Sequence, residues 1–167
     1  MEQPRFTTPR LILRPRELGD LAACVEINSD PAVMRYIGPI WPPDQQRTHL
    51  AKQIDDDLGP GLGHWTIRLR DGNEVLGWVM LAQAERSAEP ELGYRLKPAA
   101  WGRGIATEAA RTVLDYGLVE RRLGSVHAIA HRDNIASHKV LRTLGFEAVG
   151  AATRGPLPEI LFRIRGR

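Results

Sequence analysis

The sequence predicts an α/β (α+β) domain built around a mixed, mostly antiparallel sheet with one parallel pair of central strands. Short β-like runs dominate the first half of the chain, and a strand–helix–strand succession appears once in the second half. Such a succession makes a parallel crossover, which is right-handed by default. A chain of 167 residues is long enough for one domain with a sizeable core. We therefore expect a single domain over residues 1–167, with six to seven strands and about four helices.

Seven short runs have the composition and spacing of β-strands, because they alternate apolar and polar residues or are rich in β-branched residues. Asp71-Gly72-Asn73 is a good hairpin turn between two of them. Arg154-Gly155-Pro156 is the expected turn between the last two, and residues 83–90 form a polar connection. The predicted strands cover residues 10–14, 64–69, 75–81, 91–96, 126–130, 147–150 and 160–164.

Four helices and one short helical turn lie between these strands. Asp20 is a candidate N-cap for the first helix, and Asp30-Pro31 starts the short turn. Asp44 is a candidate N-cap for a polar helix, which follows a stiff loop over residues 38–43. The predicted helices cover residues 20–28, 31–36, 44–58, 107–119 and 134–144.

Composition and charge argue against several classes of protein. The hydrophobic content of 43% and the charged content of 26% are those of an ordinary globular protein. No apolar run approaches 18 residues, so neither a membrane span nor secretion is expected. The single cysteine, Cys24, excludes an internal disulfide and fits a reducing cytoplasm. The net charge of +3 is modest, and neither a nucleic-acid patch nor metal-ligand spacing is visible.

The stretch Trp101-Gly102-Arg103-Gly104-Ile105-Ala106-Thr107 lies between a predicted strand and a predicted helix. Its two glycines leave the backbone N–H groups almost uncovered where the helix opens, and Arg103 adds a positive charge. This arrangement is typical of a phosphate site, although similar turns that bind nothing also occur. The lysine of a Walker loop and the G-x-G-x-x-G spacing of dinucleotide-binding domains are both missing.

A second segment, residues 134–146, follows the predicted strand at 126–130. Asn134 is a good helix N-cap, and Gly145 is a good residue to end the helix. The helical periodicity predicts a buried stripe of Ala136, Val140, Leu141 and Leu144, whereas the helix after the glycine turn buries Ala109, Ala110, Val113 and Leu114.

These two segments resemble a known family. The patterns W-G-x-G-x-A-T-E-A and N-x-A-S-x-x-V-L-x-x-L-G-F resemble the GNAT superfamily of acyl-CoA N-acyltransferases, in its ribosomal-protein N-terminal acetyltransferase (RimJ/RimL-type) branch. The opening Thr8 to Pro15 is similar to the first strand of that branch. Trp101 stands where the superfamily usually has Gln or Arg, and the branch commonly has Trp there. The matches cover nearly the whole chain in family order.

The resemblance implies the GNAT fold, in which the two parallel strands splay apart and the pantetheine arm of acetyl-CoA lies in the V between them. It implies direct transfer of the acetyl group from the thioester to a primary amine within a ternary complex. The acceptor would be a protein N-terminus or a small-molecule amine. Self-association as a homodimer is compatible with the sequence, but no exposed apolar surface for such an interface can be identified from it.

The resemblance assigns acetyl-CoA binding to the glycine turn, to the end of the central strand and to Asn134. Amides of the turn hold the pyrophosphate, and the strand backbone pairs with the pantetheine amides as a missing strand would. Asn134 also fits a plain N-cap. The expected cofactor-binding residues are Arg95, Leu96, Gly102, Arg103, Gly104, Ile105, Ala106, Thr107 and Asn134.

Glu91 and Ser137 are the expected catalytic residues. Glu91 matches the acid of related transferases and could accept the amine proton directly or through water, or it could be a solvated carboxylate at a strand end. Ser137 occupies the position of a Tyr or Ser thought to protonate the CoA sulfur, or it could only cap its helix. His127 and His131 share one face of their strand and are candidates of second rank.

Tyr36, Trp41 and Tyr94 are the expected substrate residues, with core positions as the alternative. In this architecture the acceptor approaches from the side opposite to CoA. The segment Pro156-Leu157-Pro158 makes the C-terminal part shorter and more broken by proline than is usual for the branch, which weakens the case for an N-terminal peptide. Two other functions stay open: a non-catalytic acyl-CoA-binding sensor or scaffold, and an RNA-associated accessory protein with salt-dependent binding.

Overall fold

The computed structural model describes residues 2–83, 87–152 and 155–166. Over these residues, eight strands form one sheet in the order β1-β2-β3-β4-β5-β6-β8-β7. Neighbouring strands are antiparallel except for β5 and β6, which are parallel. The strands are β1 (Phe6–Thr7), β2 (Leu11–Pro15), β3 (Gly63–Leu69), β4 (Val75–Gln83), β5 (Pro90–Leu96), β6 (Ser125–His131), β7 (Glu147–Ala151) and β8 (Glu159–Arg165).

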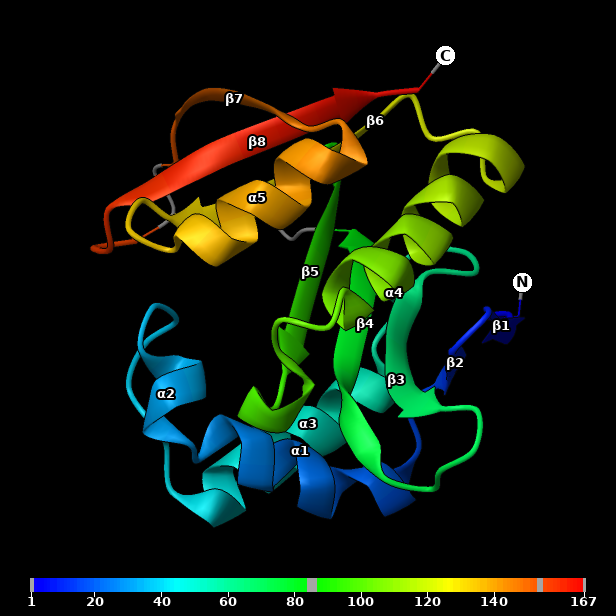
Figure 1. The fold of residues 1–167 in the computed structure, drawn as a ribbon, viewed down its shortest axis with the longest axis vertical. Helices are drawn as coiled ribbons and strands as arrows, with labels where there is room; N and C mark the ends of the chain where they lie inside the picture. The colour runs from blue at the N-terminus through cyan, green and yellow to red at the C-terminus, as the bar shows by residue number, and fades with distance from the viewer. Residues whose placement is uncertain (1, 84–86, 153–154, 167) are drawn as a thin grey trace.

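The helices pack on the two faces of this sheet. Figure 1 shows α1, α2 and α3 gathered at one end of the molecule, away from α4 and α5. Val79 and Leu81 of β4 lie in the core cluster that includes α4 and α5, whereas Trp78 lies in a second cluster with α1 and α3. Successive residues of a strand point to opposite faces, so β4 serves both cores. In the described chain the α-helices are α1 (Leu21–Asn28), α2 (Pro31–Met34), α3 (Pro43–Asp55), α4 (Ile105–Asp115) and α5 (Ile135–Leu144).

The predicted fold class is confirmed, and the sheet has more strands than predicted. All seven predicted strands are present, and the additional strand is β1, which has two residues. The last two strands form the predicted antiparallel pair, with β8 inserted between β6 and β7. Arg154 of the predicted turn, and residues 84–86 of the predicted connection, lie outside the described residues.

Two helix boundaries differ from the prediction for local reasons. Helix α3 ends at Asp55 rather than near Leu58, because Asp56 is extended and the carboxylate of Asp57 accepts the N–H of Gly59. Helix α4 begins at Ile105 and continues into a π-helical turn, Tyr116–Glu120. Gly117 lies in this turn against the sheet, where a Cβ atom would stand 2.6 Å from Cδ2 of Leu81.

Asp20 does not cap α1 as predicted. Its side chain is buried, and its two carboxylate oxygens accept hydrogen bonds of 2.8 and 2.6 Å from the guanidinium of Arg14. The hydroxyl of Thr66 and the N–H of Glu17 donate to the same carboxylate, at 2.8 and 2.9 Å. Burial alone would raise the pKa of Asp20, but these hydrogen bonds outweigh it and lower the pKa below its usual value.

The buried stripe of α5 also differs from the prediction. Ala136 is exposed, whereas His138 is buried beside Leu141 and Leu144. The ring of His138 packs on Phe162 at 5.3 Å between centroids, and its Nε2 lies 3.0 Å from the carbonyl oxygen of His131. The buried face of α5 therefore includes His138 in place of Ala136.

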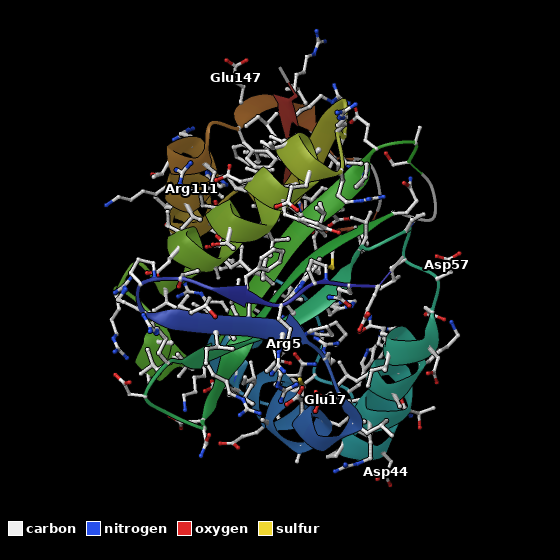
Figure 2. The ribbon with its side chains drawn as sticks, turned by 90° about the vertical axis from the view of Figure 1, so that its right-hand side faces the viewer. Arg5, Glu17, Asp44, Asp57, Arg111 and Glu147 are labelled. Atoms are coloured by element: carbon white, nitrogen blue, oxygen red, sulfur yellow. The ribbon has the colours of Figure 1, made fainter. Side chains whose placement is uncertain are left out.

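Charged side chains of both signs lie around the outside of the fold (Figure 2). Four exposed examples are Asp44 of α3, Arg111 of α4, and Arg5 and Glu17, which lie outside the helices and strands. Against this background the ion pair between Arg14 and Asp20 is unusual, because both side chains are more than nine-tenths buried.

We expect Asp20→Asn to lower the free energy of unfolding by about 3 kcal/mol, because it removes the buried counter-charge of the Arg14 guanidinium and leaves the exposed carboxylate of Glu17 at 3.5 Å. The matched control is Asp56→Asn, which removes a partner of the exposed Lys52 pair and should cost less than about 1 kcal/mol. Urea unfolding measures both changes. A loss below about 1 kcal/mol for Asp20→Asn would contradict the assignment.

The same pair has a pH signature. Because the folded-state pKa of Asp20 is lowered, its contribution is present above the unfolded pKa of about 3.9 and is lost as the pH falls through the folded pKa. The difference in unfolding free energy between the wild type and Asp20→Asn should therefore shrink below about pH 4. Urea unfolding of both proteins between pH 7 and pH 3 tests this expectation.

Candidate active site

The two parallel strands β5 and β6 meet at one point and then separate. In the described chain their register contains one pair, Glu91 opposite His127, whereas β4 and β5 pair from Gly77 opposite Leu96 to Gln83 opposite Pro90. Figure 1 shows β8, the antiparallel partner of β6, running obliquely to β5. This is the divergence that the resemblance implied. Between the strands lies a cleft of about 290 Å³.

The cleft is lined by both strands and by the ends of neighbouring elements. Its lining residues are Tyr36, Ile37, Trp78, Met80, Glu91, Leu92, Gly93, Tyr94, Arg95, Ala128, Ile129, Ala130, His131, Asn134, Ser137, Leu141 and Glu159. The side chains of β5 alternate between its two faces. Tyr94 points toward α5, where it contacts Ser137, and Arg95 points toward α1, where it contacts Asn28.

The glycine turn lies where β5 leads into α4. Gly102 and Gly104 have φ angles of 68° and 74°, in the left-handed region that favours glycine. No side chain caps α4, so the N–H groups of its first turn have no side-chain acceptor. A Cβ atom at Gly102 would meet nothing within 4 Å, so the turn is open above this residue. The indole N–H of Trp101 donates to the carbonyl of Leu96 at 2.9 Å and ties the turn to the strand end.

A clamp from the N-terminal segment fixes this turn. The carboxylate of Glu108 accepts hydrogen bonds from the hydroxyl of Thr8 at 2.6 Å and from Nε of Arg10 at 2.7 Å. Nη1 of Arg10 donates to the carbonyl of Arg103 at 2.6 Å. Burial would raise the pKa of Glu108, but the bonds from Thr8 and Arg10 lower it below its usual value. Sequence reasoning missed this clamp, although Thr8, Arg10 and Glu108 belong to the motifs that carried the resemblance.

Asn134 and Ser137 lie together at the first turn of α5. The side chain of Asn134 accepts the backbone N–H of Ser137 at 3.2 Å, as an N-cap does. The hydroxyl of Tyr94 donates to Oγ of Ser137 at 3.2 Å. Burial raises the pKa of Tyr94, and the bond to Ser137 offsets part of that shift. The cap uses the backbone of Ser137, so its hydroxyl is available to the cleft.

Glu91 is not a solvated carboxylate at a strand end. Its side chain is 14% exposed, and Oε2 lies 3.7 Å from Nε2 of His127. Nδ1 of His127 is buried without a hydrogen-bond partner. His131 lies farther along β6, where its ring packs against Tyr36 with 5.1 Å between centroids. The point where the two strands pair is therefore marked by Glu91 and His127. His131 lies four residues farther along β6, where the strands have separated.

The three expected substrate residues lie in different places. Tyr36 lines the cleft beside His131, and Tyr94 lines it on the side of α5. Trp41 does not line the cleft. Its ring is half-exposed and packs edge-on against His49 of α3.

Glu159 lines the cleft but was not identified from the sequence. It begins β8 opposite His131 of β6. Its position depends on β8 lying beside β6, which the local pattern of the last two strands does not reveal.

Two further features bear on the kind of site. Among the described residues, no group of three or more His, Cys, Asp or Glu side chains is arranged to hold a metal ion. None of the helices in the described ranges has the length and apolar character needed to span a bilayer.

Comparison with known proteins places this geometry in a family. Residues 10–147 match the family model of the acetyltransferase (GNAT) domain. The chain is 31% identical over 146 residues to the uncharacterized N-acetyltransferase p20 of Bacillus licheniformis, covering 86% of this chain and 82% of that protein. It is 29% identical over 143 residues to the spermidine N(1)-acetyltransferase of Escherichia coli K12, covering 83% and 73% of the two chains.

Solved structures share the fold at low identity. A GNAT-family acetyltransferase from Bacillus anthracis superimposes with a TM-score of 0.84 and 23% identity, covering 98% of this chain and 99% of the other. RimL, a ribosomal L7/L12 α-N-protein acetyltransferase in complex with coenzyme A, superimposes with a TM-score of 0.80 and 16% identity, covering 97% and 98%. With the family match over residues 10–147, the chain belongs to the GNAT acetyltransferases and is an N-acetyltransferase.

Proposed function

We propose that the protein transfers the acetyl group of acetyl-CoA directly to a primary amine within a ternary complex. The observation that carries this proposal is the cleft between β5 and β6. The open glycine turn follows the end of β5, and Glu91 and Ser137 face the cleft from different elements. Family membership supports acetyl transfer to an amine as the reaction class.

The residues around the cleft fit acetyl-CoA. The backbone amides of the turn and of the first turn of α4, from Gly102 to Thr107, suit a pyrophosphate at the N-terminus of α4, and residues 102–104 are exposed. Beyond Glu91, the edge of β5 that faces β6 has no strand partner in the described chain, so backbone groups near Arg95 and Leu96 suit the pantetheine amides. Asn134 lines the same cleft. When bound, acetyl-CoA supplies an activated acyl carbon and a thiolate leaving group.

Glu91 is proposed as the general base. In the reaction the acceptor nitrogen loses a proton, a bond forms between that nitrogen and the acyl carbon, and the bond from that carbon to sulfur breaks. A carboxylate shielded from bulk solvent and lining the cleft can receive the proton directly or through water. A backbone N–H of β5 is proposed to stabilise the developing oxyanion, an effect worth about 3 kcal/mol for one donor.

Ser137 is proposed to donate its hydroxyl proton to the leaving sulfur and to regain a proton from water afterwards. Its hydroxyl lies on the face of the cleft beside α5, and the hydroxyl of Tyr94 donates to it. Because the pKa of Tyr94 is raised, Tyr94 keeps its proton at neutral pH and orients the lone pairs of Ser137. The proton of Ser137 is then directed away from Tyr94 and is free for the sulfur.

The acceptor is proposed to be a protein N-terminus or a small-molecule amine, and the RimJ/RimL-type branch is part of this proposal. The relatives act on both kinds of amine, as the names of the ribosomal-protein and spermidine enzymes state. A cytoplasmic location, expected from the single cysteine, also belongs to the proposal. A non-catalytic acyl-CoA-binding module has no supporting observation and becomes an outcome of the first test.

The first test is release of free thiol from acetyl-CoA by the purified protein. The acceptor panel contains short peptides with free N-termini, polyamines and aminoglycosides. We expect thiol release with one acceptor class. If no acceptor in the panel causes thiol release and calorimetry shows tight binding of acetyl-CoA, the non-catalytic binding module is favoured instead.

A second test concerns Ser137. We expect Ser137→Ala to lower kcat about 100-fold while the KM for acetyl-CoA changes little, because only the proton donor is lost. The N-cap bond uses the backbone N–H, so the helix should stay intact. Thr143→Ala removes a hydroxyl from the exposed side of the same helix and should leave kcat unchanged. Unchanged kcat in Ser137→Ala would reject the assignment.

A third test concerns the glycine turn. Gly102→Ala adds a methyl group to the open surface of the turn, where a bound pyrophosphate would lie, and we expect the Kd for acetyl-CoA to rise at least tenfold in calorimetry. Gly61 has a φ of 73°, so Gly61→Ala introduces a similar backbone strain of about 1–2 kcal/mol away from the turn. Equal affinity loss in the two variants would mean that strain, and not the turn surface, causes the effect.

A further inference from the structure

Two arginines flank one tryptophan on the α1 side of the cleft. The guanidinium carbon of Arg16 lies 4.8 Å from the ring centroid of Trp78, and that of Arg95 lies 5.3 Å from it. Trp78 and Arg95 both line the cleft, whereas Arg16 is not among its lining residues and is 5% exposed. Both distances are those of cation–π contacts, which attract each guanidinium to the indole.

The positive charge of this pair is not neutralised by an adjacent acid. Nη1 of Arg16 donates to the amide oxygen of Gln53, and Nη1 of Arg95 donates to that of Asn28 at 2.5 Å. In the part of the chain that the structure describes, no carboxylate forms an ion pair with either arginine. Asp20 is engaged by Arg14 instead.

The free edge of Arg95 faces the cleft. Among the described residues, the buried nitrogens without a hydrogen-bond partner include Nε and Nη2 of Arg16. They include no nitrogen of Arg95. Nη1 of Arg95 donates to Asn28, the structure records no hydrogen bond from its Nε and Nη2 to another described residue, and Arg95 lines the cleft, so these two groups are available to a ligand bound there. Burial, followed by the charge of Arg16, lowers the pKa of Arg95 to about 10, which leaves it charged at neutral pH.

We infer that Arg95 binds an anionic group of the acceptor, a carboxylate or a phosphate, so that the preferred substrates are amines that also carry an acid. The edge formed by Nε and Nη2 matches two oxygens of such a group. This inference rests on the proposed function and specifies its substrate class. The backbone of Arg95 is assigned to acetyl-CoA and its side chain to the acceptor.

The position of Arg95 sets where the acid lies on the acceptor. Arg95 and Glu91 share one face of β5, four residues apart, and their Cα atoms are separated by about 13 Å of extended strand. The reacting amine beside Glu91 and the acidic group beside Arg95 must therefore be several bonds apart within the acceptor molecule. An α-amino acid is too short, whereas a short peptide with an acidic side chain is long enough. A polyamine would meet the positive charge of Arg95 unfavourably.

The experiment compares acceptors that differ in one charge. Peptides with a free N-terminus carry Asp or Asn, Glu or Gln, and phosphoserine or serine at positions two to four, and kcat/KM is measured by thiol release. The wild type should prefer one acidic member at least tenfold. The Asp and phosphoserine series distinguish a carboxylate from a phosphate. In Arg95→Gln this acid-to-neutral ratio should fall toward one, and in Arg95→Lys it should be partly kept.

The control is Arg47→Gln, which removes one exposed positive charge from α3 outside the cleft lining and should keep the wild-type ratio. Acetyl-CoA binding by calorimetry verifies that each variant is folded. The acid-to-neutral ratio of the wild type tests the inference even if a variant fails to fold. A ratio near one in the wild type, or a wild-type ratio retained in Arg95→Gln, would overturn the inference. Absence of thiol release with every acceptor would instead reject the proposed function.

Discussion

The parallel pairing of β5 and β6 at a single position is the constraint on which the rest of the site depends. Each strand is held firmly on its other side, β5 by β4 and β6 by β8. The separation between the two halves of the sheet therefore lies beyond the single pair of Glu91 and His127. Backbone groups that face this gap need hydrogen-bond partners, which water or an extended polar ligand can supply.

The order of elements along the chain concentrates helix ends at the open side of that gap. Helix α4 begins shortly after β5 ends, and α5 begins shortly after β6 ends. Because β5 and β6 are parallel, both helix N-termini are directed to the same region, with their uncapped or lightly capped amides. Helix N-termini carry a partial positive charge, which favours an anionic ligand. The opposite face, toward α1, instead carries the individual charges of Glu91 and Arg95.

Local sequence patterns predicted the strands, the stripe of α4 and the cap at Asn134, because each depends on residues close together in the chain. Local patterns gave wrong or missing predictions for residues whose contact partners are distant in the chain. Asp20 is a residue type that often caps helices, yet its carboxylate accepts hydrogen bonds from Arg14 and Thr66 inside the fold. The cleft position of Glu159 follows from strand order, and the free edge of Arg95 follows from Asn28 and Trp78, which no local pattern connects to it.

The clamp between Glu108 and the segment at Thr8 and Arg10 joins parts of the chain that are synthesised far apart in time. The contact spans about 100 residues. During translation the first hairpin emerges long before α4, so the glycine turn gains these contacts only after residue 108 has been synthesised. A ligand that binds the finished turn would stabilise only molecules in which both segments have come together, so its affinity would report on complete folding.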